Sequence, residues 1–282
     1  MFAYPSDSVA AMLTEGERWA REELERLRFT PTGVFRFLMA SRRRSAEIRR
    51  ARPQLARRAW SWMAVGAVLY LAVPVRLRPA LAWWAATAVM LDWHLGMFET
   101  EDGRPRNLGP ADALTLARAW LVPIALDTPS PLVCLAAAAT DALDGPAARR
   151  AGATRAGRDL EGLVDACFTA AALRGARRHG WLGRGPVAGE LARLGAGLAY
   201  AVGVWFGRAQ PPGEALLHAA RWSTALRVGG LATAGSGRRR LADALLLAGS
   251  ALSLALLGRA VAASSRDASR SRASSPGAGR TS

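Results

Sequence analysis

The sequence predicts an all-α protein, a polytopic helix bundle in a membrane, and three observations support this class. Of its 282 residues, 51% are hydrophobic and 21% are charged, so the chain has ample apolar material to bury. The polar, arginine-rich residues gather at the two ends, in residues 1–58 and 263–282. Between these ends, residues 59–75 and 79–98 have the length and apolar character of membrane-spanning helices.

The N-terminal segment, residues 1–58, is predicted to lie in the cytosol or at the membrane interface. Residues 9–28 carry Glu and Arg at helical spacing and predict a charged helix, which the Pro-Thr-Gly sequence at 31–33 ends. The apolar residues 34–39 then precede three arginines at 42–44. An apolar patch beside an arginine run is typical of a segment on an anionic membrane surface, and a solvated basic linker is the alternative.

Residues 59–98 are predicted to form two transmembrane helices outside the catalytic core. The first stretch, 59–75, carries no charge, and the second, 79–98, is polar only near its end, at Asp92 and His94. Tryptophan is enriched where membrane helices meet the water interface. We therefore expect five tryptophans to form interfacial belts: Trp60, Trp62, Trp83, Trp84 and Trp93.

Six further helices are predicted after residue 107, in segments that are less hydrophobic and contain ionisable residues. Ionisable residues inside a membrane are costly and indicate function by default. The predicted segments are 110–126, 129–150, 158–178, 187–206, 215–235 and 241–261. The Ser- and Arg-rich tail, 263–282, is expected to be disordered.

This topology leaves one conflict open. With eight helices and both ends in the cytosol, the loops at 174–184 and 236–240 lie outside, yet both are rich in arginine. Cytoplasmic loops usually carry the excess of positive charge. Either the number of membrane helices is not eight, or the excess of positive charge in cytoplasmic loops is a weaker signal in a chain whose 38 basic residues are all arginine.

Four carboxylates in one short stretch are the main chemical signal. Two of them lie three residues apart and two lie four apart, so each pair shares one face of a helix. Four carboxylates aimed at one point repel each other unless a cation neutralises them, and Mg²⁺ or Mn²⁺ prefers such oxygen ligands. The candidate ligands are Asp141, Asp144, Glu161 and Asp165.

The same stretch resembles a known family signature. The pattern Asp141-x2-Asp144-Gly145-x2-Ala148-Arg149-x7-Gly157-x3-Glu161-x3-Asp165 resembles that of the CDP-alcohol phosphatidyltransferases, which carry Asp where this chain has Glu161. The segment from Asn107 to Arg118 resembles the start of that family's first core helix, with Asp112 in place of the usual Asn. The resemblance covers residues 107–262 and implies a six-helix catalytic core there.

The resemblance implies transfer of a phosphatidyl group from CDP-diacylglycerol to an alcohol, with release of CMP, in phospholipid synthesis. It implies that the four carboxylates hold two Mg²⁺ (or Mn²⁺) ions and that Asp165 is the general base for the acceptor hydroxyl. It also implies a homodimer in the cell membrane with its active site facing the cytoplasm. The residues implied to line the CDP site are Gly145, Ala148, Arg149 and Gly157.

The acceptor alcohol is not specified by the sequence. Arg118, Arg221 and Arg227 are candidates for binding an anionic acceptor such as glycerol 3-phosphate, with an inositol phosphate or a phospholipid as alternatives. These arginines, together with Arg193, have a second interpretation, namely ion pairing with acidic residues of neighbouring helices. The acidic candidates for such pairs are Asp112, Glu190 and Glu214.

The sequence also suggests two other classes of function. The first is a non-catalytic membrane relative whose metal site is weakened by Glu161. The second is a nucleic-acid-binding protein, suggested by the net charge of +16. The scattered basic residues, the absence of a recognised nucleic-acid motif and the apolar pair at 59–98 all argue against the second class.

Overall fold

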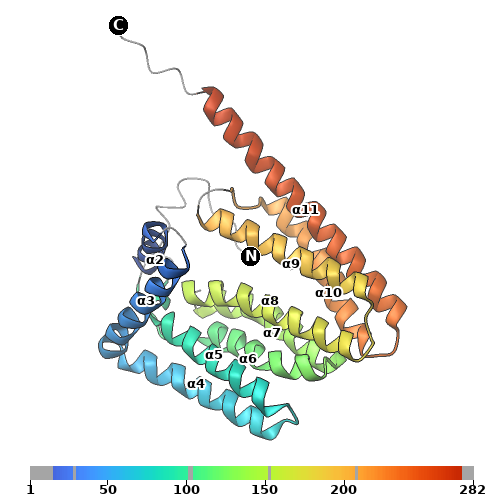
Figure 1. The fold of residues 1–282 in the computed structure, drawn as a ribbon, viewed down its shortest axis with the longest axis horizontal. Coiled ribbons are helices and arrows are strands. Elements are labelled where there is room, and N and C mark those ends of the chain that lie inside the picture. The colour runs from blue at the N-terminus through green and yellow to red at the C-terminus, as the bar shows by residue number, and fades with distance from the viewer. Residues whose placement is uncertain (1–14, 28–29, 101–103, 152–153, 207–208, 275–282) are drawn as a thin grey trace.

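The computed structural model describes residues 15–27, 30–100, 104–151, 154–206 and 209–274, and this part of the chain is helical (Figure 1). The all-α prediction is confirmed, since the only β-type pairing among the described residues is an isolated bridge between Glu99 and Pro105. The helices are α2 (Glu15–Arg26), α3 (Pro31–Ala51), α4 (Pro53–Ala72), α5 (Leu77–Trp93), the 3-10 turn η1 (Leu95–Met97), α6 (Pro110–Asp127), α7 (Pro131–Ala151), α8 (Arg155–Arg178), α9 (Arg184–Trp205), α10 (Glu214–Ala234) and α11 (Arg239–Ser274).

The N-terminal helix α3 lies crosswise at one end of the bundle (Figure 1). The Thr30 side chain caps it by accepting a hydrogen bond from the Gly33 N–H at 3.0 Å. Arg49 and Ser45 both bind the carboxylate of Asp92 on α5, which anchors α3 to the bundle. The predicted charged helix over 9–28 is confirmed as α2, while residues 9–14 and 28 lie outside the described part of the chain.

The predicted pair at 59–98 forms helices whose ends differ from the prediction. Helix α4 begins at Pro53, six residues earlier than predicted, and ends at Ala72. The next residue, Val73, precedes Pro74, and the residue before a proline disfavours the helical conformation. Helix α5 ends at Trp93, and residues 95–97 form a separate 3-10 turn. Gly96, a poor helix former, lies in that turn.

Several tryptophans of the predicted interfacial belt are half-buried and contact neighbouring helices. The indole N–H of Trp83 donates to the Ala119 carbonyl at 2.7 Å, and that of Trp84 donates to the Met63 carbonyl at 2.8 Å. Trp62 packs against Trp120 of α6 with ring centroids 6.1 Å apart. Neighbouring helices thus supply acceptors and ring partners for Trp62, Trp83 and Trp84, and the interfacial belt stays a prediction.

The six predicted core helices coincide with α6 to α11. Helix α6 is central, since it packs against both α7 and α8, while α10 packs against α7 and α11 packs against α9 and α10. Two apolar clusters meet on α6: one contains Leu116 and Trp120 with residues of α4 and α5, and the other contains Val122 and Ala125 with residues of α7, α8, α10 and α11. Helix α6 thus joins the N-terminal helices to the rest of the bundle.

Helix α11 is longer than predicted and extends beyond the bundle (Figure 1). It continues to Ser274, so residues 263–274 are helical and the prediction of a disordered tail is wrong for them. This part of the tail contains Ala, Ser, Arg and Asp but no Gly or Pro before Pro276, so no helix-breaking residue stops the helix. Residues 275–282 of the predicted tail lie outside the described part of the chain.

Two described helices are long and apolar enough to span a membrane, Arg184–Trp205 in α9 and Arg239–Ser264 in α11. Few residues of the α9 segment are buried in the protein. Large apolar side chains, including Leu198 and Leu191 on α9, are exposed on the surface. These helices belong to the predicted core rather than to the 59–98 pair, and they support an association with the membrane.

Candidate functional site

The carboxylates of the motif lie on α7 and α8, which both pack against α6. The start of α8 is tied to the start of α6 through hydrogen bonds of Asp112. Its Oδ1 accepts from the Thr154 hydroxyl at 2.6 Å, and its Oδ2 accepts from the Gly109 N–H at 2.7 Å. Thr154 in turn caps α8 by accepting from the Gly157 N–H at 3.0 Å. These bonds fix the start of α8 against the start of α6. They thereby set the positions of Glu161 and Asp165, which follow one to three turns further along α8.

The contact between the starts of α6 and α8 requires glycine at position 157. A Cβ atom at residue 157 would lie 2.6 Å from Asp112 Oδ1 and 2.8 Å from Thr154 Oγ1, closer than carbon and oxygen atoms approach without a bond. The resemblance implies that Gly157 lines the CDP site, and this stays a prediction; in the structure Gly157 packs against Asp112 of α6. The close approach of the two helix starts is thus sufficient reason for a glycine here.

We expect Gly157→Ala to destabilise the protein by about 1–3 kcal/mol, because the added methyl forces Asp112 and Thr154 apart. The matched control is Gly162→Ala on the same helix, where a Cβ atom meets nothing within 4 Å. That change is expected to be neutral or to stabilise by up to about 1 kcal/mol through helix propensity. Thermal unfolding of both variants in detergent measures the difference, and equal stability of the two would contradict the packing role of Gly157.

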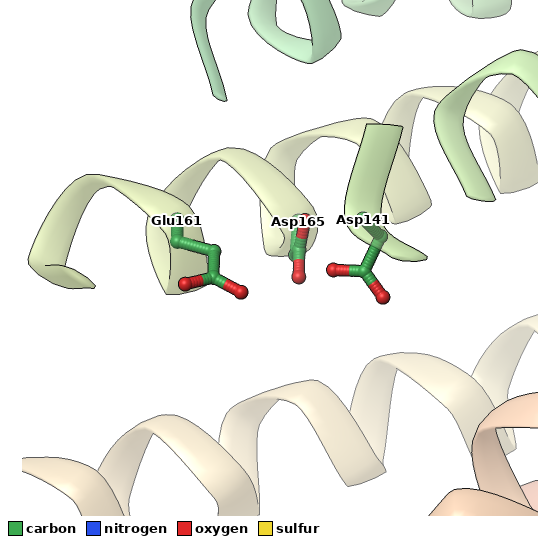
Figure 2. A group of neighbouring side chains, drawn as sticks. All are labelled: Asp141, Glu161 and Asp165. Atoms are coloured by element: carbon green, nitrogen blue, oxygen red, sulfur yellow. The ribbon is translucent and has the colours of Figure 1, made fainter. Parts of the chain in front are cut away.

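Three carboxylates form the cluster that could hold a metal ion. Asp141 of α7 and Glu161 and Asp165 of α8 each offer one oxygen, and these oxygens lie within 4.8 Å of one another. Figure 2 shows the three side chains pointing the same way from the two helices. The side chains of Asp141 and Asp165 are 44% and 43% exposed, so a ligand can reach them. A group of hard oxygen donors at this spacing fits a divalent cation such as Mg²⁺ or Mn²⁺.

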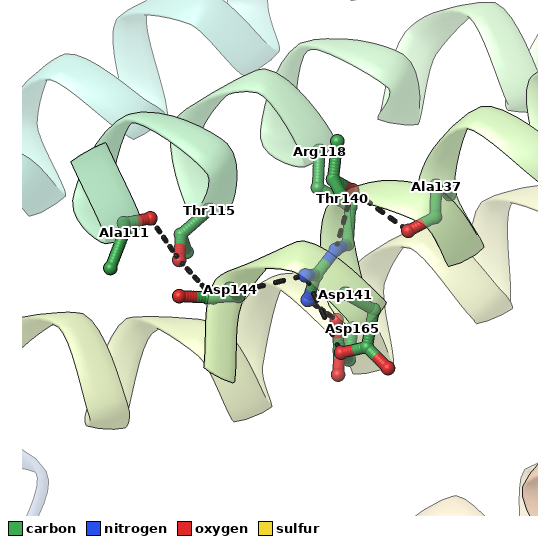
Figure 3. A network of polar contacts seen from close by, with 8 residues as sticks. All are labelled: Ala111, Thr115, Arg118, Ala137, Thr140, Asp141, Asp144 and Asp165. Carbon is green, nitrogen blue, oxygen red and sulfur yellow. Dashed lines mark hydrogen bonds and ion pairs between the residues drawn. The ribbon is translucent and has the colours of Figure 1, made fainter. Parts of the chain in front are cut away.

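Asp144, the fourth predicted ligand, lies outside this group of three. Its side chain is only 7% exposed, and its Oδ2 accepts a hydrogen bond from the Thr115 hydroxyl at 3.1 Å. It therefore faces α6, while Asp141 and Asp165 are more exposed and lie at the end of the Arg118 side chain (Figure 3). The structure thus brings three of the four predicted ligands together.

Arg118 lies between α7 and α8 and contacts carboxylates of both helices (Figure 3). Its guanidinium forms an ion pair with Asp165 and lies 3.4 Å from Asp141 Oδ1 and 3.9 Å from Asp144 Oδ2. Its Nε donates to the Thr140 hydroxyl at 3.2 Å. The sequence predicted Arg118 as an acceptor-binding residue, but the structure places it inside the acidic group as its counter-charge.

The other residues assigned to the CDP site follow the carboxylates along α7. Ala148 is buried, Gly145 is half-buried and Arg149 is exposed. The guanidinium of Arg149 bends back towards Gly145, since its Nη1 would lie 3.3 Å from a Cβ atom there. The three residues therefore lie next to Asp144 on α7, apart from the Gly157 junction.

A second charged network lies on α9, α10 and α11. Glu190 is completely buried, and its Oε1 pairs with Arg193 at 2.8 Å and with Arg227 at 3.0 Å. Its Oε2 accepts a hydrogen bond from the Ser250 hydroxyl at 2.7 Å. The ion-pairing interpretation of Arg193 and Arg227 is thus confirmed for Glu190. Arg221, the third predicted acceptor-binding residue, is exposed and makes no ion pair with a described residue.

Some residues of the site were not assigned a role from the sequence. Thr115 and Thr140 bond to Asp144 and Arg118, and Thr154 bonds to Asp112. The spacing of Thr115 and Arg118, three residues apart, is the one signal that could have placed both on one face of α6. Nothing in the local pattern indicates that Thr140 or Thr154 has a partner on α6.

Comparisons with protein-family models, with curated proteins and with solved structures found no match. The fold and the site by themselves define an all-helical protein with two helices able to span a membrane. Its candidate site is a carboxylate cluster with an internal arginine, suited to a hard metal ion.

Proposed function

We propose that this protein is a membrane-embedded CDP-alcohol phosphatidyltransferase that transfers a phosphatidyl group from CDP-diacylglycerol to a polar alcohol. The observation that carries the proposal is the meeting of Asp141, Glu161 and Asp165, whose oxygens lie within 4.8 Å although they come from two helices. These are motif positions at fixed spacing, and the side chains of Asp141 and Asp165 are partly exposed. Gathered carboxylates repel each other, and the single charge of Arg118 compensates only part of their negative charge, which favours a bound cation.

The roles of the residues follow from their chemistry. Asp141, Glu161 and Asp165 are the residues that would hold the divalent ions, and Asp144, which bonds to Thr115 of α6, adds negative charge from outside this group. Bound there, such ions neutralise the diphosphate and the charge that develops on it. Asp165 takes the proton from the acceptor hydroxyl as the acceptor oxygen forms its bond to the donor phosphorus, and the bond to CMP breaks. Gly145, directly after Asp144, and Ala148 and Arg149, one turn further along α7, are the residues we assign to the CDP moiety.

The acceptor we favour is a phosphorylated alcohol such as glycerol 3-phosphate. Arg193 and Arg227 share the single carboxylate of Glu190, so this network keeps one positive charge in excess. Arg227 lies on α10, which contacts α8, the helix that carries Asp165. A phosphate on the acceptor would balance the excess charge and hold the hydroxyl near Asp165.

The membrane arrangement we propose is multi-pass, with the acidic cluster facing the cytoplasm. The two candidate spans in α9 and α11 and the exposed apolar residues of α4 and α7, such as Leu71 and Leu132, support it. Helix α3 exposes Phe35 together with Arg42 and Arg43, which suits the surface of an anionic leaflet. Its crosswise position at one end of the bundle fits a helix lying on the membrane (Figure 1).

The experiment that tests the function is CMP release by the purified protein in detergent. The protein receives CDP-diacylglycerol, Mg²⁺ and, in separate reactions, glycerol 3-phosphate, an inositol phosphate and a phospholipid. We expect release with one acceptor and none after chelation of the metal. A folded protein that releases no CMP with any acceptor would contradict the proposal.

Glu161 is the position where this chain departs from the family pattern, and Glu161→Asp tests its effect. Glu reaches one methylene further than Asp from the same backbone position, so the substitution changes the spacing of the three carboxylates. We expect Glu161→Asp to retain CMP release and to shift its Mg²⁺ dependence by about tenfold or less. Activity that appears only in the Asp variant would instead identify the natural protein as a non-catalytic relative.

A further inference from the structure

We propose that Arg118 is the internal counter-cation of the acidic group and that its charge sets how tightly the group binds a divalent ion. The inference rests on the proposed metal site and names a residue that controls it. The resemblance assigned Arg118 no such part, and its predicted role was to bind the acceptor.

The position of Arg118 supports this role. It extends from α6 between α7 and α8, its side chain is only 2% exposed, and it lies at ion-pair distance from Asp141, Asp144 and Asp165. A buried guanidinium needs compensating negative charge. Conversely, Asp141, Asp144 and Asp165 have no second arginine within ion-pair distance among the residues whose side chains the structure describes.

The hydrogen bonds of Arg118 also differ from those of an ordinary structural ion pair. An arginine that serves only packing commonly binds one carboxylate through two parallel hydrogen bonds. Arg118 instead divides its contacts among three carboxylates, and its buried Nη2 has no hydrogen-bond partner among the described residues. The guanidinium is therefore placed as a cation shared by the group, and its Nη2 lies at ion-pair distance from both Asp141 and Asp144.

This arrangement has a consequence for metal binding. Asp141 and Asp165 belong both to the Arg118 contacts and to the three carboxylates gathered for a metal. A divalent ion bound to them would be repelled by the nearby guanidinium. Removing one unit of positive charge at this distance is expected to tighten binding on the order of tenfold, and removing one negative charge to weaken it by a similar factor.

The experiment measures Mn²⁺ binding to the purified full-length protein in detergent by calorimetry, without lipid substrates. Three variants change the formal charge of the group in a series. Arg118→Gln makes it one unit more negative, Asp144→Asn makes it one unit less negative, and the double variant restores the original value. Arg49→Gln, which removes an arginine paired with Asp92 outside the site, is the matched control.

We expect Arg118→Gln to bind Mn²⁺ about tenfold more tightly than the unmodified protein and Asp144→Asn about tenfold more weakly. The double variant and Arg49→Gln are expected to bind as the unmodified protein does. Because Arg118→Gln leaves the carboxylates uncompensated, its melting temperature is expected to fall without metal and to recover more than that of the unmodified protein when Mn²⁺ is added.

Equal or weaker binding by Arg118→Gln would overturn the counter-cation role while leaving the metal site intact. If Arg118→Gln does not fold, the test is the Mn²⁺ affinity of the double variant. An affinity equal to that of the unmodified protein supports the counter-cation role, and a different affinity excludes it. An unmodified protein that binds no Mn²⁺ would instead remove the metal site, and with it both this inference and the proposed mechanism.

Discussion

Replacing Asp165 by Asn is expected to lower the rate of CMP release by at least about 10²-fold. Asn has nearly the same size, but it cannot take a proton from the acceptor hydroxyl, and general-base catalysis contributes about 10²–10⁴-fold. The change also removes the negative charge of one of the three gathered carboxylates, leaving those of Asp141 and Glu161. Both effects act in the same direction, so the loss is expected even at saturating acceptor and Mg²⁺.

The control for this variant is Asp92→Asn. Asp92 also pairs with an arginine of another helix, Arg49, but it lies outside the carboxylate cluster. It is therefore expected to retain CMP release, although the contact between α3 and α5 is weakened. If Asp165→Asn kept more than about a tenth of the activity while Asp92→Asn lost it, the assignment of Asp165 as the base would be wrong.

Glu190→Gln is expected to be the most destabilising single substitution among those considered, at about 3–5 kcal/mol. Glu190 is 0% exposed and is the shared ion-pair partner of Arg193 and Arg227. Without its charge, two positive groups are left close together inside the bundle. We expect a markedly lower melting temperature for the variant in detergent.

Two further variants show whether the loss comes from the uncompensated arginines. Glu214→Gln changes an exposed glutamate in the first turn of α10 and is expected to shift stability by less than about 0.5 kcal/mol. The double variant Glu190→Gln/Arg193→Gln removes one charge of each sign and is expected to recover part of the lost stability. A double variant no more stable than Glu190→Gln would argue that the ion pairs are not the cause.

The helices of this protein were largely predictable from the sequence. The predicted segments for α6 through α11 lie within a few residues of the observed helices, except at the end of α11. The local pattern does not reveal contacts between helices. Trp83 and Trp84, for example, donate hydrogen bonds to the carbonyls of Ala119 and Met63 on neighbouring helices.

The candidate site was predictable in part for the same reason. Residue spacing places Asp141 with Asp144, and Glu161 with Asp165, because residues three or four apart share a helix face. Spacing within a helix does not indicate which neighbouring helix that face packs against. In the structure Asp144 turns towards Thr115 of α6, and Asp141 joins the two carboxylates of α8.

The sequence alone therefore determined the helical class, the approximate limits of the helices and the residues that carry the negative charge. The tertiary structure decided where the arginines go: Arg118 enters the acidic group, Arg227 joins Arg193 on Glu190, and Arg221 remains exposed. The physical reason is that a guanidinium on a long side chain pairs with whichever carboxylate lies within reach after the helices have packed. Such carboxylates come from other helices, and Asp165 lies 47 residues from Arg118 in the chain.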